Sequence, residues 1–291
     1  MKFLLSVLSM LCLTVLSCGS NSQKLQPDST ADRAVQLSEK PEPLPDLTTI
    51  TEPPSNCPEG MIEINGSYCP VDDAKCLYWV DNYGKRSKID TDRCGEWSKP
   101  VHCTSTIIHK HFCIAKYEAQ NKKGEIPQDW MSYNQSKAEA EKLGNRLCTH
   151  SEWSMAALGP NLHPYPFGDG FHRDHSCNID RHITEVGLTG AQVMKVSDPK
   201  SEVAEKLRSQ LVPSGSLPNC KSDYGVFDMS GNIDEWVVNE TGKPYVSGLS
   251  SGHAWGVRNA SRPMTTAHSP SFYWYESSYR QCRDIKPILS K

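Results

Sequence analysis

The cysteines constrain this chain more than any other feature of its sequence. Twelve are present, and ten of them lie between positions 57 and 282. An even set spread through one region is typical of a domain stapled by up to five disulfide bonds in an oxidising compartment. Zinc is the alternative, but the spacings contain no paired Cys-x-x-Cys. Because six of the ten lie between 57 and 113, we expect the entry to the domain to be loop-rich.

The N-terminus carries the pattern of an export signal. An apolar run from Phe3 to Leu16 is too short to span a bilayer comfortably. It leads into Ser17-Cys18-Gly19, which resembles the lipobox of bacterial lipoproteins, where the cysteine is lipidated and becomes the mature N-terminus. Ordinary cleavage after Ser20 is the alternative. We therefore predict a signal peptide at 1–17, lipidation of Cys18, and export to the bacterial cell envelope with a lipid anchor in the membrane.

Composition separates a tether from one domain. Residues 18–56 contain no aromatic residue, and prolines recur there among Ser, Thr, Asp and Glu. Such a segment cannot bury enough apolar surface to order itself, so we predict a disordered tether at 18–56 and a folded domain at 57–291. A net charge of −3 with acids and bases interspersed gives no basic stripe, which excludes nucleic acid as the partner.

Alternating and apolar runs predict the strands. Ile62 and Ile64 flank Glu63, which indicates a first strand with a hairpin at Asn65-Gly66. Apolar residues at 101–118 indicate further strands, and His109 and His111 lie among them. Two histidines on one strand face are able to bind a metal, but no carboxylate follows at ligand spacing, so we expect them to face solvent.

Capping signals predict three helices. Ser132 is typical of a cap for a helix through 135–143 that Gly144 stops, and Thr149 with Glu152 forms a capping box for the next helix. Asp198-Pro199 indicates the start of an amphipathic surface helix over 199–211.

A fourteen-residue stretch, Asp223 to Trp236, has the composition of a folded site. Asp228 and Glu235 bracket a Ser-Gly-Asn turn, so two carboxylates and the turn's carbonyls could converge on a hard cation such as Ca²⁺. In the alternative, Asp228 caps the turn and Glu235 pairs with an arginine. A His-x-x-His-x-Cys spacing ending at Cys177 suggests a transition metal, although a disulfide is the better interpretation of that cysteine.

Several separated stretches, taken together, resemble the formylglycine-generating enzyme, or sulfatase-modifying factor, family. They are Asn145–Trp153, Tyr165–Gly168, Pro213–Pro218 and, most specifically, Tyr224–Trp236. The resemblance covers roughly 57 to 286. It implies an α+β, C-type-lectin-like fold that is loop-rich and disulfide-stapled.

The resemblance also implies ligands and a disulfide. It assigns a structural Ca²⁺ to side chains and backbone carbonyls, and it pairs Cys148 with Cys282. The positions of the first ion are Asp228, Gly231, Ile233 and Glu235, and those of a second ion include Asn178 and Ile179. We also expect Cys177 to pair with Cys220, because both flank the loop before the site.

The family's chemistry is where this chain departs from the pattern. The oxidases of the family use copper, oxygen and two nearby cysteines, and soft thiolates are what select Cu(I). No cysteine lies between Cys220 and Cys282, and the corresponding stretch, 246–256, has none. We therefore assign no catalytic residue and expect no copper.

Two functions follow from these observations. The first is a non-catalytic domain that binds a protein, glycan or envelope component through loops at 160–190 and 240–275. Aromatic residues there offer a contact surface, namely Trp255, Phe272, Tyr273, Trp274 and Tyr275. The alternative is an oxidoreductase of the formylglycine-generating type, which rests on family analogy.

Overall fold

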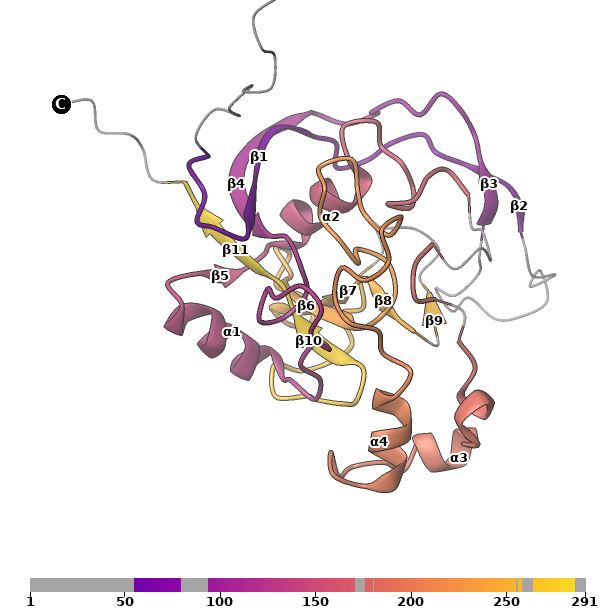
Figure 1. Ribbon diagram of the computed structural model, residues 1–291. Coiled ribbons are helices and arrows are strands. Elements are labelled where there is room, and N and C mark those ends of the chain that lie inside the picture. The colour runs from indigo at the N-terminus through magenta and orange to yellow at the C-terminus, as the bar shows by residue number, and fades with distance from the viewer. Residues whose placement is uncertain are drawn as a thin grey trace, which may run out of the picture. The chain divides into compact units, whose positions relative to one another are not determined.

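A computed structural model describes residues 55–79, 94–170, 176–179, 181–254, 256–257 and 264–285 (Figure 1). Contacts divide the chain into Met1–Glu52 and Pro53–Lys291, and all of the described residues belong to the second unit. The predicted signal peptide, Cys18 and the tether up to residue 54 lie outside the described residues. In the described part of the chain, no helix has the length and apolar character needed to cross a membrane.

Two sheets organise the domain. The larger has the strand order β1-β4-β11-β5 with antiparallel neighbours, and the smaller has the order β10-β6-β7, in which β10 runs parallel to β6. Two short pairs, β2-β3 and β8-β9, complete the described strands. The bounds are β1 (Met61–Tyr68), β2 (Cys76–Trp79), β3 (Cys94–Trp97), β4 (Ile108–Ala115), β5 (Arg146–Leu147), β6 (Asp234–Val238), β7 (Ser247–Ser250), β8 (Gly252–His253), β9 (Gly256–Val257), β10 (Ser277–Tyr279) and β11 (Gln281–Asp284).

The first strand does not turn at Asn65-Gly66, so the predicted hairpin is wrong. β1 continues through both residues and pairs along its whole length with β4, placing Gly66 opposite Lys110. A side chain at Gly66 would come within 3.3 Å of Met155 and of Tyr224. Gly66 therefore serves close packing, which is the other use of glycine inside a strand.

The two central helices begin where their capping residues predict. α1 (Tyr133–Lys142) and α2 (His150–Leu158) each have a complete capping box, in which the side chain of Ser132 or Thr149 accepts a hydrogen bond from the third helical amide. α2 is almost wholly buried and packs against β1 and β4, where Trp153 and Met155 join a core with Ile64 and Ile114. The central helix is thus locally specified and fixed by its burial.

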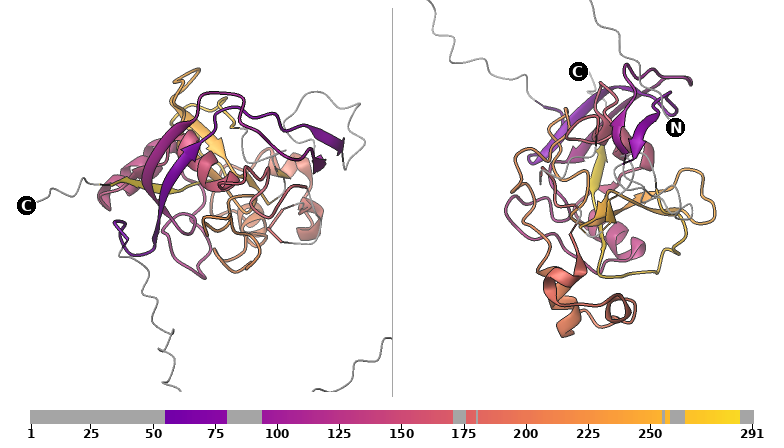
Figure 2. Two further views of the ribbon diagram at one scale, coloured as in Figure 1. Left: turned by 90° about the horizontal axis from the view of Figure 1, so that it is seen from above. Right: turned by 90° about the vertical axis from the view of Figure 1, so that its right-hand side faces the viewer.

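The predicted helix over 199–211 is shorter than expected. α4 (Glu202–Arg208) has Ser201 as its cap, while the Asp198 side chain accepts from the Lys200 amide and forms a turn ahead of the helix. Leu207 and Leu211 are buried as predicted. α4 lies beside α3 (Gly190–Val193) and a 3₁₀ turn, η1 (Ile183–Val186), at the end of the domain away from β1 and β4 (Figures 1 and 2).

Five disulfides staple the described chain. Two of them are the expected pairs, Cys148 with Cys282 and Cys177 with Cys220. The other three hold the N-terminal part of the domain: Cys57–Cys113, Cys69–Cys103 and Cys76–Cys94. Regular structure is short and loops are long, as the fold prediction required.

Candidate functional site

Glu235 lies on β6 in the middle of the smaller sheet and has no solvent exposure. Its carboxylate is paired with Arg280, which is equally buried between β10 and β11. Arg280 Nη2 donates to Glu235 Oε1 at 2.6 Å and Nε donates to Oε2 at 2.8 Å, while Trp153 Nε1 donates to Oε2 at 2.6 Å. The guanidinium also donates to the carbonyls of Ala115 and Phe227. This two-point ion pair joins the two sheets through buried atoms.

Asp228 is buried beside this pair and has a positive φ of 57°. Its Oδ2 accepts a hydrogen bond from the Gly215 amide at 2.7 Å. Burial raises the pKa of Asp228 to about 6, against a hydrogen bond from Gly215 that lowers it. Asp228 is therefore a turn residue whose carboxylate is held by backbone.

Glu118 is a further buried carboxylate that the sequence patterns did not single out. Its Oε2 accepts from Ser214 Oγ at 2.7 Å and from Asn232 Nδ2 at 2.8 Å, whereas Oε1 has no hydrogen-bond partner among the described residues. Burial, with the charges of Asp228 and Glu235, holds the pKa of Glu118 well above its ordinary value. Its signal in the sequence is weak, a single acid at the third position after β4 ends.

The turn residues between the two predicted ligands are already bonded within the chain. The Gly231 carbonyl accepts from the Ile233 amide at 2.8 Å and from Ser251 Oγ at 3.1 Å. Asn178 donates through Nδ2 to Asn232 Oδ1, and the Asn178 carbonyl accepts from the Asn232 amide. The structure thus brings 178–179 and 231–233 together, with Ile179 and Ile233 buried.

These contacts bear on the predicted Ca²⁺. In the described part of the chain, no group of three or more His, Cys, Asp or Glu side chains is placed to hold a metal ion. Both oxygens of Glu235 and the carbonyl of Gly231 already accept internal hydrogen bonds. Glu235 and Gly231 therefore do not fit a calcium ion in this arrangement, and the ligand set with Asn178 and Ile179 stays a prediction.

The stretch expected to carry the family's thiol pair forms β7 and β8–β9. Ser250 is buried on β7, and its hydroxyl lies 3.2 Å from His150 Nδ1. All ten cysteines of the described residues are in disulfides, so this part of the chain holds no free thiol. The side chain of His253 and all of Trp255, His172 and His175 lie outside what the structure describes. His109 and His111 are exposed, and His111 Nε2 lies 2.7 Å from Glu63 Oε1.

A cavity of about 350 Å³ is lined mainly by aromatic side chains. Tyr273 is half exposed there, whereas Tyr275 is buried in the neighbouring core and contributes no surface. Trp130, which sequence reasoning missed, lies 6.2 Å from Tyr273 between ring centroids and has a φ of 58°. A bulky residue in this left-handed region marks local strain. The lining residues are Trp130, Val196, Ser197, Phe272, Tyr273 and Trp274.

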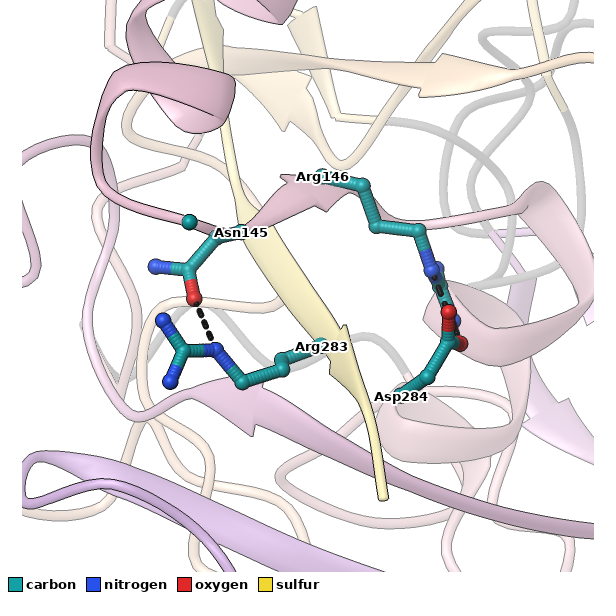
Figure 3. A pocket seen from close by; sticks show the side chains of 5 residues that line it. Asn145, Arg146, Arg283 and Asp284 are labelled. Atoms are coloured by element: carbon teal, nitrogen blue, oxygen red, sulfur yellow. Dashed lines mark hydrogen bonds and ion pairs between the residues drawn. The ribbon is translucent and has the colours of Figure 1, made fainter. Parts of the chain in front are cut away.

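Two other cavities are lined in part by charged residues. One of about 410 Å³ lies where α1, β5 and β11 meet, and Figure 3 shows Arg146 turned toward Asp284 and Arg283 toward Asn145. Arg146 on β5 also donates two 2.7 Å hydrogen bonds to Glu152 on α2, so this charged side chain of the cavity joins two elements of the fold. The other, of about 470 Å³, lies in the predicted 160–190 loop region beside His163, whose Nδ1 is 2.6 Å from Asp169 Oδ1.

The amino-acid sequence of this chain is similar to those of known proteins. The sequence profile described as "Sulfatase-modifying factor enzyme 1-like domain" matches residues 74–281. An "Inactive C-alpha-formylglycine-generating enzyme 2" of Bos taurus is 28% identical over 40% of this chain and 34% of its own length. A "Formylglycine-generating enzyme" of Thermomonospora curvata is 30% identical over 38% of this chain and 32% of its own length. The matched part spans about a third of these relatives.

Among solved structures, PvdO of Pseudomonas aeruginosa has a TM-score of 0.45 at 17% identity, covering 79% of this chain and 95% of that one. The predicted α+β, C-type-lectin-like, disulfide-stapled fold class is confirmed by the family match together with the observed sheets and disulfides. Because the profile extends over most of the folded region, this chain belongs to the family of sulfatase-modifying factor enzyme 1-like domains.

Proposed function

We propose that this protein is an exported, membrane-tethered lipoprotein whose domain binds a protein or glycan of the cell envelope without catalysing oxidation. The observation that carries the proposal is the state of the cysteines. Every cysteine from Cys57 to Cys282 is in a disulfide, so the described domain offers no thiolate pair for Cu(I). Two matched relatives are named as inactive enzymes, which supports a non-catalytic role for the part of the chain that matches them.

The aromatic cavity is the surface we propose for binding. Clefts lined by aromatic rings with a few polar groups are the usual form of ligand sites, and Ser197 supplies a hydroxyl at this one. The half-exposed Tyr273 ring is open to a partner, and aromatic residues contribute strongly when a partner covers them. The cavity beside His163 lies in the other predicted loop region and is a second candidate contact surface.

Binding is tested with the purified chain and two tyrosine variants. We expect Tyr273→Ala to weaken binding to isolated envelope glycan or envelope protein fractions at least tenfold in a titration. Tyr78→Ala is the matched control, because Tyr78 is 54% exposed on β2 and does not line the aromatic cavity. Equal affinity of Tyr273→Ala and the unaltered chain would contradict the proposed surface.

Oxidase activity is tested separately. The chain is incubated with Cu(I), oxygen and a cysteine-containing peptide, and formylglycine is measured by mass. We expect no product above the rate without protein. Turnover by a chain whose disulfides remain intact would favour the oxidoreductase alternative and contradict the non-catalytic assignment.

Lipid attachment has its own test. Cells expressing the chain are fed labelled palmitate, and the label is expected on the unaltered protein and absent from Cys18→Ser. If neither protein is labelled and N-terminal sequencing finds cleavage after Ser20, the predicted lipid anchor is wrong and the protein is secreted by ordinary signal cleavage.

A further inference from the structure

The buried pair of Glu235 and Arg280 occupies a position where the family pattern leads one to expect calcium. Both side chains have no solvent exposure. Glu235 lies on β6, and Arg280 lies between β11 and β10, the parallel neighbour of β6. Each oxygen of Glu235 accepts two contacts. Oε1 accepts from Arg280 Nη2 at 2.6 Å and Nε at 3.1 Å, and Oε2 accepts from Arg280 Nε at 2.8 Å and Trp153 Nε1 at 2.6 Å.

The backbone side of the expected calcium site is equally engaged. The Gly231 carbonyl accepts two hydrogen bonds, from Ile233 and Ser251, and a carbonyl oxygen has two lone pairs. A calcium ion would need several of these oxygens at once, at 2.3–2.6 Å. It would also lie beside a buried guanidinium, and two positive charges in a low-dielectric interior repel strongly.

We infer that the Arg280 guanidinium supplies, from within the chain, the positive charge that the family pattern assigns to a calcium ion at Glu235. The same group reaches farther than an ion would. It donates to the Ala115 carbonyl at the end of β4 and to the Phe227 carbonyl beside Asp228. Arg280 therefore links β4, the turn before β6, and β6 itself, and this part of the domain is calcium-independent.

Melting temperatures in calcium and in chelator test the inference. The proteins are the unaltered chain, Glu235→Gln, Arg280→Met and the double variant, each measured in Ca²⁺ and in EDTA. Each single variant leaves one buried group without its partner, so we expect the melting temperature to fall by about 10 °C in both solutions. The double variant removes both charges and is expected to recover part of that loss. Arg208→Met is the control, because its pair with Asp129 is partly exposed and the loss should be smaller.

The decisive comparison is the effect of EDTA at Glu235. If EDTA lowers the melting temperature of the unaltered chain and this effect disappears in the double variant, calcium binds at Glu235 and the inference is wrong. An EDTA effect that is equal in both proteins assigns any bound calcium elsewhere and supports it.

A second measurement does not depend on melting or on the single variants, which keeps the inference testable if those variants fail to fold. Tb³⁺ is titrated into the unaltered chain and the double variant while tryptophan is excited, since Trp153 contacts the Glu235 carboxylate. We expect the same emission from both proteins. Saturable emission that Ca²⁺ displaces in the unaltered chain, and that is missing from the double variant, would overturn the inference.

Discussion

At the scale of single residues, the protein shows how a buried charge is held. Glu235 is paired, Asp228 is fixed by a backbone amide, and Glu118 keeps one oxygen without a partner among the described residues. Only the first arrangement neutralises its charge completely. Ionising the carboxyl of Glu118 costs the folded state free energy, because burial penalises the charged form.

Replacing Glu118 by glutamine tests that argument. The amide keeps an oxygen for Ser214 and Asn232 and puts N–H donors where the orphaned oxygen lies. A carboxyl whose pKa is raised in the folded state loses stability as pH rises through its folded pKa, and glutamine has no such loss. We expect Glu118→Gln to melt higher than the unaltered chain at pH 8, with the difference shrinking toward pH 5. Glu118→Ala, which removes the bonds, should melt lower at both values.

At the scale of elements, the sequence predicted correctly those features that depend on residues close together in the chain. The caps of α1 and α2 depend on residues three apart, so Ser132 and Thr149 could be identified from the sequence. The predicted hairpin at Asn65-Gly66 is wrong because both residues pair with β4, with Asn65 opposite His111 and Gly66 opposite Lys110, and this distant pairing competes with a local turn. Pairing of Glu235 with an arginine was only the alternative to calcium, and Arg280 could not be named, since a contact between residues 45 apart leaves no periodic trace.

The N-terminal cap of α1 gives a stability prediction. Ser132 Oγ accepts from the Gln135 amide, and the Gln135 side chain accepts from the Ser132 amide. Ser132→Ala removes the first of these bonds and should lower the free energy of unfolding by about 1 kcal/mol, measured by urea denaturation. Ser216→Ala is the control, because Ser216 is exposed and lies outside the described helices. Equal losses would mean that the effect is not one of capping.

The pairing of β1 with β4 includes a titratable contact. Hydrogen bonds from the Asn56 side chain, His111 and the Asn56 amide lower the pKa of Glu63 from 4.5 to about 2. A lowered carboxyl pKa contributes stability above pH 4.5 that is lost as pH falls toward 2. The contact is open to solvent, so the contribution is below about 1 kcal/mol. Glu63→Gln should remove this part of the acid sensitivity in melts from pH 6 to pH 2, whereas Glu96→Gln on β3 should not.

At the scale of the whole molecule, disulfides compensate for short sheets and long loops. Cys148–Cys282 ties β5 to β11 across 134 residues, while Cys76–Cys94 closes only 18 residues between β2 and β3. The sequence identified the first pair through family resemblance and left the three N-terminal pairs open. Ten cysteines permit many pairings, and only the folded positions choose among them.

Loop length predicts which of these two bonds matters more. In the chain-entropy account, the gain from a cross-link rises with the logarithm of the enclosed loop, which favours Cys148–Cys282 by about 2 kcal/mol. Both of its cysteines are fully buried, so replacing them also disturbs the core around Trp153. We expect Cys148→Ala with Cys282→Ala to lower the free energy of unfolding more than Cys76→Ala with Cys94→Ala, in urea titrations of the two double variants. Equal losses would contradict the loop-length argument.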